Sequence, residues 1–257
     1  MENRKKIEIE YYDKRAEERL EKDKRKTGDF EEFEPFLLSS FKFVYDFLKD
    51  KCANKKVLDY GCGDGVHSVW LAELGAELKA IDLSENSLQI AKERVGTRNA
   101  EFLKMDCEKM EFSDNSFDII FDGGTFSSLD LNKVFPELAR VLKPKGFLIG
   151  VETFGHNPFT NLKRKINKIT KKRTGWAVSH IVKNKDLKMA KEYFGKVEVY
   201  YFHLISWIAF PFLKFFGVKS FLKLLEKIDK LLLYIFPFLK NYCFKIVFIM
   251  SEPKNEF

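Results

Sequence analysis

The segment from Val57 to Gly65 (VLDYGCGDG) combines residue types that suit the binding of a small polar ligand. An apolar run ends in Asp59, and glycines then follow at alternate positions. Glycine allows the backbone to turn sharply and lets a ligand approach the main chain closely. The apolar-periodic run from Val66 to Leu74 predicts a helix, whose first N–H groups have no partner within the helix. The segment therefore predicts a strand, a tight turn and a helix start, with a binding site at the turn.

The spacing of these glycines argues against a dinucleotide site. A dinucleotide-binding turn has the pattern G-x-G-x-x-G, whereas this chain has G-x-G-x-G. Asp59 and Asp64 would repel the phosphate groups of a dinucleotide, but they tolerate a cationic ligand. The turn therefore favours a positively charged ligand without phosphate.

Further acids stand at the ends of the next predicted strands. Asp82, Asp106 and Asp122 end or follow the strands predicted over 77–83, 100–105 and 117–121. The carboxyl ends of parallel strands meet at one edge of an open α/β sheet, where such sheets bind ligands. A carboxylate at position 82 can accept hydrogen bonds from both hydroxyls of a ribose.

Strand and helix patterns alternate along most of the chain. This alternation predicts a doubly wound α/β fold, a parallel sheet with helices on both faces. We expect an N-terminal helical arm or cap over 1–50, where apolar residues repeat at helical spacing from 30 to 50, and one domain over 51–257. Two insertions interrupt that domain, one basic (155–185) and one apolar (205–240). The predicted strands are 55–60, 77–83, 100–105, 117–121, 146–151, 196–204 and 242–250, and the predicted helices are 64–74, 87–95, 131–142 and 186–194.

Taken together, these motifs resemble those of the class I S-adenosylmethionine (SAM)-dependent methyltransferases. Residues 59–65 resemble the first motif of that family, Asp82 its second-strand acid, and residues 105–107 its adenine site. Residues 112–123 (FSDNSFDIIFDG) and 138–146 (LARVLKPKG) are similar to the ubiquinone/menaquinone-biosynthesis-like subgroup, methyltransferase type 11. The resemblance covers about 55–152. It implies a seven-stranded, mostly parallel sheet whose last strand runs antiparallel, and methyl transfer from SAM, which leaves as S-adenosylhomocysteine.

The resemblance also implies which residues hold the cofactor. Tyr12 resembles a tyrosine of an N-terminal arm that folds over the cofactor, although an ordinary aromatic residue of an amphipathic helix explains it equally well. His67 is interpreted as a residue of the first helical turn rather than a catalyst. The expected cofactor-binding residues are Tyr12, Asp59, Gly61, Cys62, Gly63, Asp82, Leu83, Asp106, Cys107 and Asp122.

Methyl transfer to a hydroxyl group requires a proton acceptor, and two histidines are candidates. His156 lies in a Gly-His-Asn-Pro segment directly after the fifth predicted strand, and His180 follows an Arg-Thr segment further along. Similar segments recur in one branch of the family, many of whose members have an acid where this chain has Ser179. The alternative is that both histidines form hydrogen bonds that fix a loop. Transfer to oxygen is expected ahead of transfer to carbon or nitrogen.

The apolar insertion at 205–240 is rich in phenylalanine, leucine and lysine. Prolines, a glycine and lysines interrupt it, so it lacks the ~18 uncharged residues of a membrane-spanning helix. Lysines at 219, 223, 227 and 230 recur at helical spacing, and a basic stripe opposite apolar residues is typical of a helix in a membrane interface. Three interpretations remain open: contact with an anionic membrane, a lid over an apolar pocket, and a homodimer interface.

Composition narrows the remaining classes. The net charge of +7 favours a polyanionic partner, either nucleic acid or an anionic membrane surface. The residues after Asp122 are two glycines, unlike the Pro-Pro-aromatic motif of enzymes that methylate base amines, so nucleic acid is disfavoured as a substrate.

Hydrophobic residues make up 45% of the chain, enough for a sizeable core. The four cysteines are scattered, so neither a disulfide framework nor a metal site is expected, and the charged N-terminus predicts a cytoplasmic chain.

The sequence therefore predicts a SAM-dependent methyltransferase. Its expected acceptor is a hydrophobic or lipid-linked small molecule, such as a quinone precursor, reached at the inner face of a membrane. The alternatives are a nucleic-acid methyltransferase and a non-catalytic membrane adaptor that retains the fold. The identity of the acceptor stays open.

Overall fold

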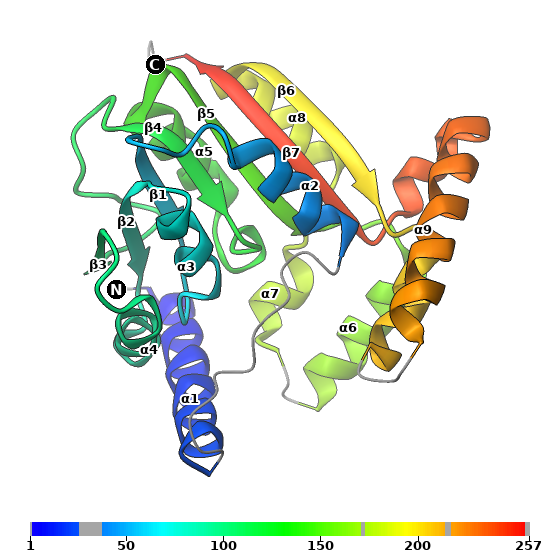
Figure 1. Cartoon of the computed structure of the whole chain (residues 1–257), viewed down its shortest axis with the longest axis horizontal. Coiled ribbons are helices and arrows are strands. Elements are labelled where there is room, and N and C mark those ends of the chain that lie inside the picture. The colour runs from blue at the N-terminus through cyan, green and yellow to red at the C-terminus, as the bar shows by residue number, and fades with distance from the viewer. Residues whose placement is uncertain (1, 26–37, 171–172, 214–216, 255–257) are drawn as a thin grey trace.

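The structure is a computed structural model that describes residues 2–25, 38–170, 173–213 and 217–254 (Figure 1). The apolar repeat predicted over 30–50 lies partly outside the described residues. Its second half forms helix α2 (Ser39–Leu48), whose buried side chains include Phe41, Val44 and Leu48. Because α2 packs against β5 and β7, this part of the predicted arm adjoins the central sheet.

A single seven-stranded sheet forms the centre of the described chain, in the order β3-β2-β1-β4-β5-β7-β6. Every neighbouring pair is parallel except the two that involve β7, which runs antiparallel to both β5 and β6. The predicted fold class is confirmed, including the antiparallel last strand. The strands are β1 (Lys56–Tyr60), β2 (Glu77–Asp82), β3 (Ala100–Lys104), β4 (Phe117–Asp122), β5 (Leu142–Thr153), β6 (Phe194–Phe202) and β7 (Lys245–Pro253).

Strand β5 begins earlier than its prediction over 146–151. Leu142, predicted to end the preceding helix, pairs with Phe117 of β4, and the register then shifts before Phe147 pairs with Ile119. Pro144 falls inside this irregular stretch, where the ladder needs no donor from it. The fully buried side chain of Leu142 explains the pairing, because it belongs to the core beneath the sheet.

Helices cover both faces of the sheet. Helices α3 (Val66–Glu73) and α4 (Glu85–Val95) follow β1 and β2, while α5 (Leu131–Val141) and α8 (Asn184–Tyr193) pack together on the opposite face. Ser84 is the N-cap of α4, since its hydroxyl accepts a hydrogen bond from the Ser87 N–H at 3.1 Å. This two-sided burial holds the strands rigidly and presents their carboxyl ends at one edge.

Helix α1 (Asn3–Arg25) lies across that carboxyl edge, where it packs beside α4 (Figure 1). It is strongly polar, and its buried residues in the described part are Glu8 and Ala16. A helix with so little apolar surface gains little from hydrophobic burial. Its position therefore depends on specific polar contacts with the sheet domain.

The two insertions meet beyond β6 and β7 (Figure 1). The basic insertion forms α6 (Pro158–Ile169) and α7 (Gly175–Ser179), and the apolar insertion forms the 3-10 helices η2 (Ser206–Phe212) and η3 (Pro237–Tyr242) on either side of α9 (Val218–Ile235). The amide of Asn157, at the start of α6, donates to the Tyr242 carbonyl at 2.7 Å and so joins the two insertions. None of the described helices has the length and apolarity needed to cross a bilayer.

The carboxylate of Asp229 attaches α9 to the rest of the chain. It is buried and accepts hydrogen bonds from the backbone N–H groups of Leu204, Ile205 and Ser206, at 3.0, 2.8 and 3.3 Å. These N–H groups lie in the turn that leads from β6 into η2, where no helical partner is available. One side chain thus fixes the orientation of the longest helix of the apolar insertion.

We expect Asp229→Ala to release α9 from the β6–η2 turn. The substitution leaves three buried donors without their acceptor, which costs roughly 1–3 kcal/mol of local stability. Hydrogen exchange followed by mass spectrometry should show faster exchange in 204–235 and unchanged exchange in β1 and β4. Asp46→Ala, which removes an exposed acid paired with Lys42, serves as the control and should leave exchange unaltered throughout. Equal exchange in the Asp229 variant and wild type would contradict this role.

Candidate active site

A cavity of about 350 Å³ opens at the carboxyl edge of the sheet, between the ends of β1, β2 and β4 and the overlying helix α1. Among the predicted cofactor-binding residues, all except Asp122 line it: Tyr12, Asp59, Gly61, Cys62, Gly63, Asp82, Leu83, Asp106 and Cys107. Segments far apart in sequence therefore converge on one space, as the positions of the strand ends predict.

The glycine turn forms the floor of this cavity. Gly61 has a φ of +68°, and a Cβ there would lie 2.4 Å from the Thr125 side chain. Gly65 has a φ of +74°, and a Cβ there would lie 2.7 Å from that of Ala91. Both the left-handed backbone and the close packing exclude other residues. At Gly63, by contrast, a Cβ would meet nothing within 4 Å, so the space above this backbone is open to a ligand.

Asp82 connects the glycine turn with the start of α4. One of its carboxylate oxygens accepts the Gly63 N–H at 2.9 Å, and the other accepts the Ser84 N–H at the same distance. Burial raises the pKa of this carboxyl, while these two hydrogen bonds act in the opposite direction. The Ser84 hydroxyl in turn donates to Asp13 of α1 at 2.5 Å. The carboxylate is therefore oriented toward the cavity before any ligand binds.

Two of the predicted acids lie deeper in the protein. Asp59 is almost fully buried and accepts a hydrogen bond from the Ser68 hydroxyl at 2.6 Å, and burial raises its pKa to about 7. Asp122 is fully buried, and one of its oxygens accepts the Thr125 N–H at 2.9 Å. Burial and the nearby Glu152 raise the pKa of Asp122 well above its usual range. Asp122 thus supports the loop after β4 from behind, and it does not line the cavity.

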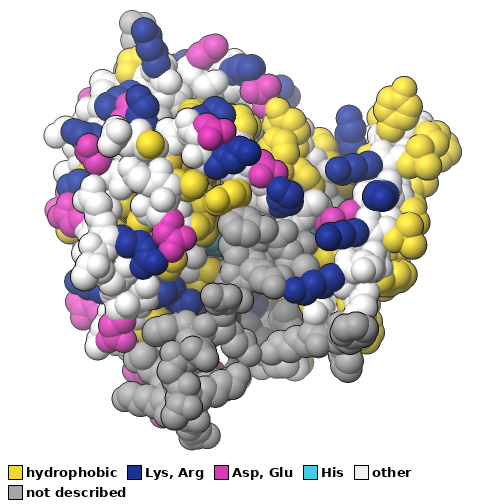
Figure 2. Space-filling view, viewed as in Figure 1, with side chains coloured by type: hydrophobic (Ala, Val, Ile, Leu, Met, Phe, Trp, Pro, Cys, Tyr) yellow, Lys and Arg dark blue, Asp and Glu magenta, His cyan; other side chains and the backbone are white. Residues whose placement is uncertain are grey.

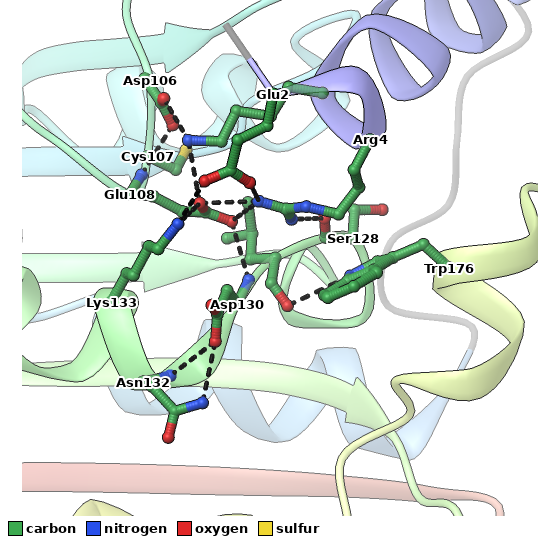
Figure 3. A network of polar contacts seen from close by, with 12 residues as sticks. Glu2, Arg4, Asp106, Cys107, Glu108, Ser128, Asp130, Asn132, Lys133 and Trp176 are labelled. Carbon is green, nitrogen blue, oxygen red and sulfur yellow. Dashed lines mark hydrogen bonds and ion pairs between the residues drawn. The ribbon is translucent and has the colours of Figure 1, made fainter.

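Electrostatic contacts hold the N-terminal end of α1 over the cavity (Figure 3). The Glu108 carboxylate, whose side chain is fully buried, accepts from Arg4 at 2.6 and 2.7 Å and from the Asp130 N–H at 2.8 Å. The Lys5 ammonium lies 2.9 Å from Glu108 and 2.5 Å from Asp106. A buried carboxylate with several donors is a strong anchor, because removing any partner exposes an uncompensated charge. The sequence analysis did not identify Glu108, although it directly follows the predicted adenine-site pair.

Arg4 also brings helix α7 into the site. Its guanidinium lies 4.5 Å from the centre of the Trp176 ring and donates to the Ser128 carbonyl at 3.0 Å (Figure 3). The Trp176 indole N–H donates to the Leu129 carbonyl at 3.4 Å. The basic insertion, the loop after β4 and the N-terminal arm therefore meet at one arginine.

Two side chains of α1 extend into the cavity wall from above. The Tyr12 hydroxyl lies 3.2 Å from the Ser128 hydroxyl and 3.4 Å from an Arg173 nitrogen, so this tyrosine faces inward. Glu8, which the sequence analysis did not identify, is buried and accepts a hydrogen bond from the Thr174 hydroxyl. Its second carboxylate oxygen has no hydrogen-bond partner, and burial raises the pKa of the group. Glu8 is therefore an unsatisfied acceptor at the cavity.

The structure brings neither of the two candidate catalytic histidines to the cavity. His156 accepts a hydrogen bond from the Asn184 N–H at 3.2 Å, which fixes the loop after β5 to the start of α8. His180 is exposed and stacks on Trp176 with ring centres 3.6 Å apart. Neither residue lines the cavity. These contacts correspond to the loop-fixing alternative, and the catalytic assignment stays a prediction.

His67, by contrast, does line the cavity. Its Nδ1 accepts the Trp70 indole N–H at 3.3 Å, so the proton of the neutral ring resides on Nε2. Burial lowers its pKa to about 4, and the ring is therefore uncharged near neutral pH. A Cβ at Gly123 would lie 2.6 Å from this ring, which explains the glycine there.

Comparison with known proteins identifies the central segment. Residues 58–150 match the family model described as a methyltransferase domain. The methyltransferase GfsG of Streptomyces halstedii is 38% identical over 111 residues, covering 41% of this chain and 40% of that protein. The demethylmenaquinone methyltransferase of Clavibacter sepedonicus is 35% identical over 99 residues, covering 38% and 40%. The resemblance to type 11 methyltransferases is thus confirmed for this segment, and the chain spans about 40% of the length of these relatives.

Solved structures share the fold over most of the chain. The phosphoethanolamine N-methyltransferase 2 of Haemonchus contortus, in complex with SAM, aligns with a TM-score of 0.56 and 20% identity, covering 83% of this chain and 52% of that one. The geranyl diphosphate C-methyltransferase of Streptomyces coelicolor A3(2) aligns with a TM-score of 0.57 and 13% identity, covering 82% and 77%. At this identity, the likeness establishes the architecture of the sheet and its helices.

The buried carboxyl of Asp59 should leave a signature in the pH dependence of stability. Its pKa is about 7 in the folded chain and about 4 in the unfolded chain. Between these values the unfolded chain binds fewer protons, so the carboxyl lowers stability progressively as the pH rises toward 7. Urea denaturation from about pH 5 to about pH 7.5 should show wild type losing roughly 2–3 kcal/mol more than Asp59→Asn. Parallel pH profiles for the two proteins would show that Asp59 does not titrate in this range.

Proposed function

We propose that this chain is a SAM-dependent methyltransferase that acts on a hydrophobic small molecule. The cavity at the carboxyl edge of the sheet carries this proposal, since the predicted cofactor residues other than Asp122 line it. The match to the methyltransferase domain model, which covers the cavity-lining ends of β1 to β4, supports it. The enzyme class and the cofactor follow from the same match.

The residues present fit SAM in charge and shape. SAM supplies an electrophilic methyl group on a positively charged sulfur. Asp82 offers oriented carboxylate oxygens to a diol, and the open backbone above Gly63 suits the amino-acid end. Asp106 and Cys107 form, with Leu83, the side of the cavity proposed for adenine. The acids that line the cavity outnumber its cations, Arg4, Lys5 and Arg19, and this excess favours a cation over the phosphates of NAD or ATP.

We assign the protein two tasks in the reaction, orientation of the acceptor and exclusion of water. Helix α1 lies over the cavity with Tyr12 turned toward its interior, so we assign the exclusion of water to this helix. For transfer to oxygen, Glu8 is our candidate proton acceptor because its free oxygen and raised pKa suit that role. His156 and His180 remain competing candidates for the proton acceptor. Comparing the methyl-transfer activities of variants at the three positions can decide among them.

The proposed acceptor is hydrophobic or lipid-linked, such as a quinone precursor. Two similar proteins support this class, since one is a demethylmenaquinone methyltransferase and another was solved with geranyl diphosphate. The large exposed apolar surface of the two insertions supports it as well. We therefore place the reaction at the inner face of a membrane. A non-catalytic adaptor with this fold would transfer no methyl group, so methyl transfer from tritiated SAM distinguishes it from an enzyme.

The test of the proposed function is the binding of S-adenosylhomocysteine measured by calorimetry. We expect wild type to bind it and to ignore NAD and ATP. Asp82→Asn should weaken binding by about 10- to 100-fold, because hydrogen bonds to a charged group contribute roughly 1.5–3 kcal/mol. Asp46→Asn, an exposed acid away from the cavity, should bind like wild type. Binding of NAD or ATP in place of S-adenosylhomocysteine would overturn the proposal.

The three proton-acceptor candidates can be separated by transfer from tritiated SAM into a lipid extract. We expect Glu8→Gln to reduce the extractable label by roughly 100-fold, as loss of a general base does, with S-adenosylhomocysteine affinity near that of wild type. His156→Ala and His180→Ala should stay within about threefold of wild type, since neither ring lines the cavity. The reverse ranking would return the base role to a histidine.

A further inference from the structure

The exposed apolar surface of the described chain is gathered at one end of the molecule. Apart from Ile7, every large apolar side chain that is exposed in the described residues lies between Phe159 and Tyr242. These side chains belong to α6, η2, α9 and η3, which we call collectively the apolar face. Scattered exposed apolar residues are ordinary, whereas a contiguous group of this kind marks an interaction site.

Helix α6 presents its apolar side to solvent. Phe159, Leu162, Ile166 and Ile169 recur at intervals of three and four, and they are 50 to 81% exposed. The opposite side of the same helix carries the buried polar residues Thr160 and Arg164. An ordinary surface helix buries its apolar stripe against the core, so α6 has the reverse orientation.

Helix α9 repeats this arrangement. Its exposed apolar residues are also spaced three and four apart, while Leu222 and Asp229 face the rest of the chain. Figure 2 shows the apolar side chains along the outer edge of this helix, with a row of cationic side chains beside them. The exposed stripe consists of Phe221, Leu224, Ile228, Leu231 and Ile235.

The two stripes are joined by the 3-10 helices between them. The Phe159 ring lies 5.8 Å from that of Trp207 in η2, where Ile208 and Phe212 are also about half exposed. The hydrogen bond from Asn157 to Tyr242 attaches the start of α6 to η3, which adds the exposed Phe238. The apolar face is therefore one surface built from both insertions.

The charge around this surface has a single sign. Lysines 219, 223, 227 and 230 of α9 and lysines 165 and 168 of α6 are exposed. Helix α6 contains no acid, and the two acids of α9 turn inward. Glu226 accepts a hydrogen bond from the Ser39 N–H at 3.0 Å, and Asp229 holds the β6–η2 turn. The surface thus combines exposed apolar stripes with lysines and lacks an exposed acid among the described residues of these helices.

We propose that the apolar face lies in the interface of an anionic lipid bilayer, with α6 and α9 parallel to the membrane. Apolar stripes flanked by lysine fit the acyl chains and the anionic headgroups of such a bilayer together. A second copy of this chain is a poorer occupant, because it would bring lysines against lysines without acids to pair them. The stripes face solvent, so they do not serve as the inner wall of a lid.

This proposal deepens the proposed function, and its link to a lipid-linked acceptor rests on that function. The basic insertion that contributes α6 to the apolar face also contributes α7 to the cavity region. Arg173 and Thr174, just before α7, contact Tyr12 and Glu8 in the cavity wall. A chain docked through α6 thus keeps the cavity in contact with the segment that touches lipid.

The test is flotation of the full chain with vesicles, carried out without cofactor. Wild type should float with vesicles of phosphatidylcholine and phosphatidylglycerol and much less with phosphatidylcholine alone. The variant L162S/I169S/L224S/L231S should stay at the bottom with both. K223E/K227E should lower the partition coefficient for the mixed vesicles by about tenfold or more, whereas K92E/K188E, the same charge change elsewhere, should not.

Several outcomes would overturn the proposal. Wild type that stays at the bottom with the mixed vesicles, a serine variant that still floats, or equal losses in the two lysine variants would each do so. A stable wild-type dimer in sedimentation experiments that the serine variant dissociates would show instead that a second copy covers the face. Failure of S-adenosylhomocysteine binding with successful flotation would reject the proposed function and leave the membrane surface intact.

Discussion

The geometry of the cavity depends on the Asp82 carboxylate, which holds the glycine turn after β1 and the start of α4 after β2 in one position. Two parallel strands bring these segments together, and a single side chain then fixes their spacing through charge-assisted hydrogen bonds. Since the turn itself contains three glycines with positive φ, its backbone has little intrinsic preference for this shape. The hydrogen bonds to Asp82 therefore fix a backbone conformation that the glycines alone would leave flexible. Under the proposed function, the affinity for the cofactor and the rigidity of the turn would depend on the same side chain.

The N-terminal helix is held over this site by a different principle. Helix α1 buries little apolar surface, and Glu108, Asp106 and Ser84 anchor it through polar groups at the ends of β2 and β3. Arg19 adds an ion pair with Asp64 in the glycine turn. The buried pairs with Glu108 hold α1 firmly, because separating them would leave an uncompensated charge, whereas salt weakens the exposed pair of Arg19. The position of α1 over the cavity therefore rests mainly on buried ion pairs and hydrogen bonds.

The strands and the residues of the cavity wall could be predicted from the sequence, because short stretches of neighbouring residues identify them. An apolar run that ends in an acid, followed by glycines, identifies a strand end without tertiary knowledge. Glu8 and Glu108 were not predicted as site residues, because their positions in the site depend on hydrogen bonds to residues far away in the chain. His156 was a catalytic candidate because it directly follows β5, and the hydrogen bond from the Asn184 N–H to its ring could not be predicted from the sequence. The apolar stripe of α6 was not predicted, because apolar residues and lysines are mixed in its sequence. The burial of Arg164 shows which side of the helix faces the protein.

The distribution of charge connects the two ends of the molecule. The chain has a net charge of +7, yet the acids that line its cavity outnumber the cations there, Arg4, Lys5 and Arg19. Helices α6 and α9, which carry exposed lysines, lie at the other end of the described chain, beyond β6 and β7 (Figure 1). The proposed anionic surface and the proposed cationic cofactor would therefore be attracted to separate regions of the chain. Helix α6 belongs to the apolar face, and α7 lies beside the cavity, where the Arg4 guanidinium sits over the Trp176 ring. Under the proposed function, a hydrophobic acceptor would therefore move from the lipid at α6 toward the cavity at α7, away from the groups proposed for the cofactor.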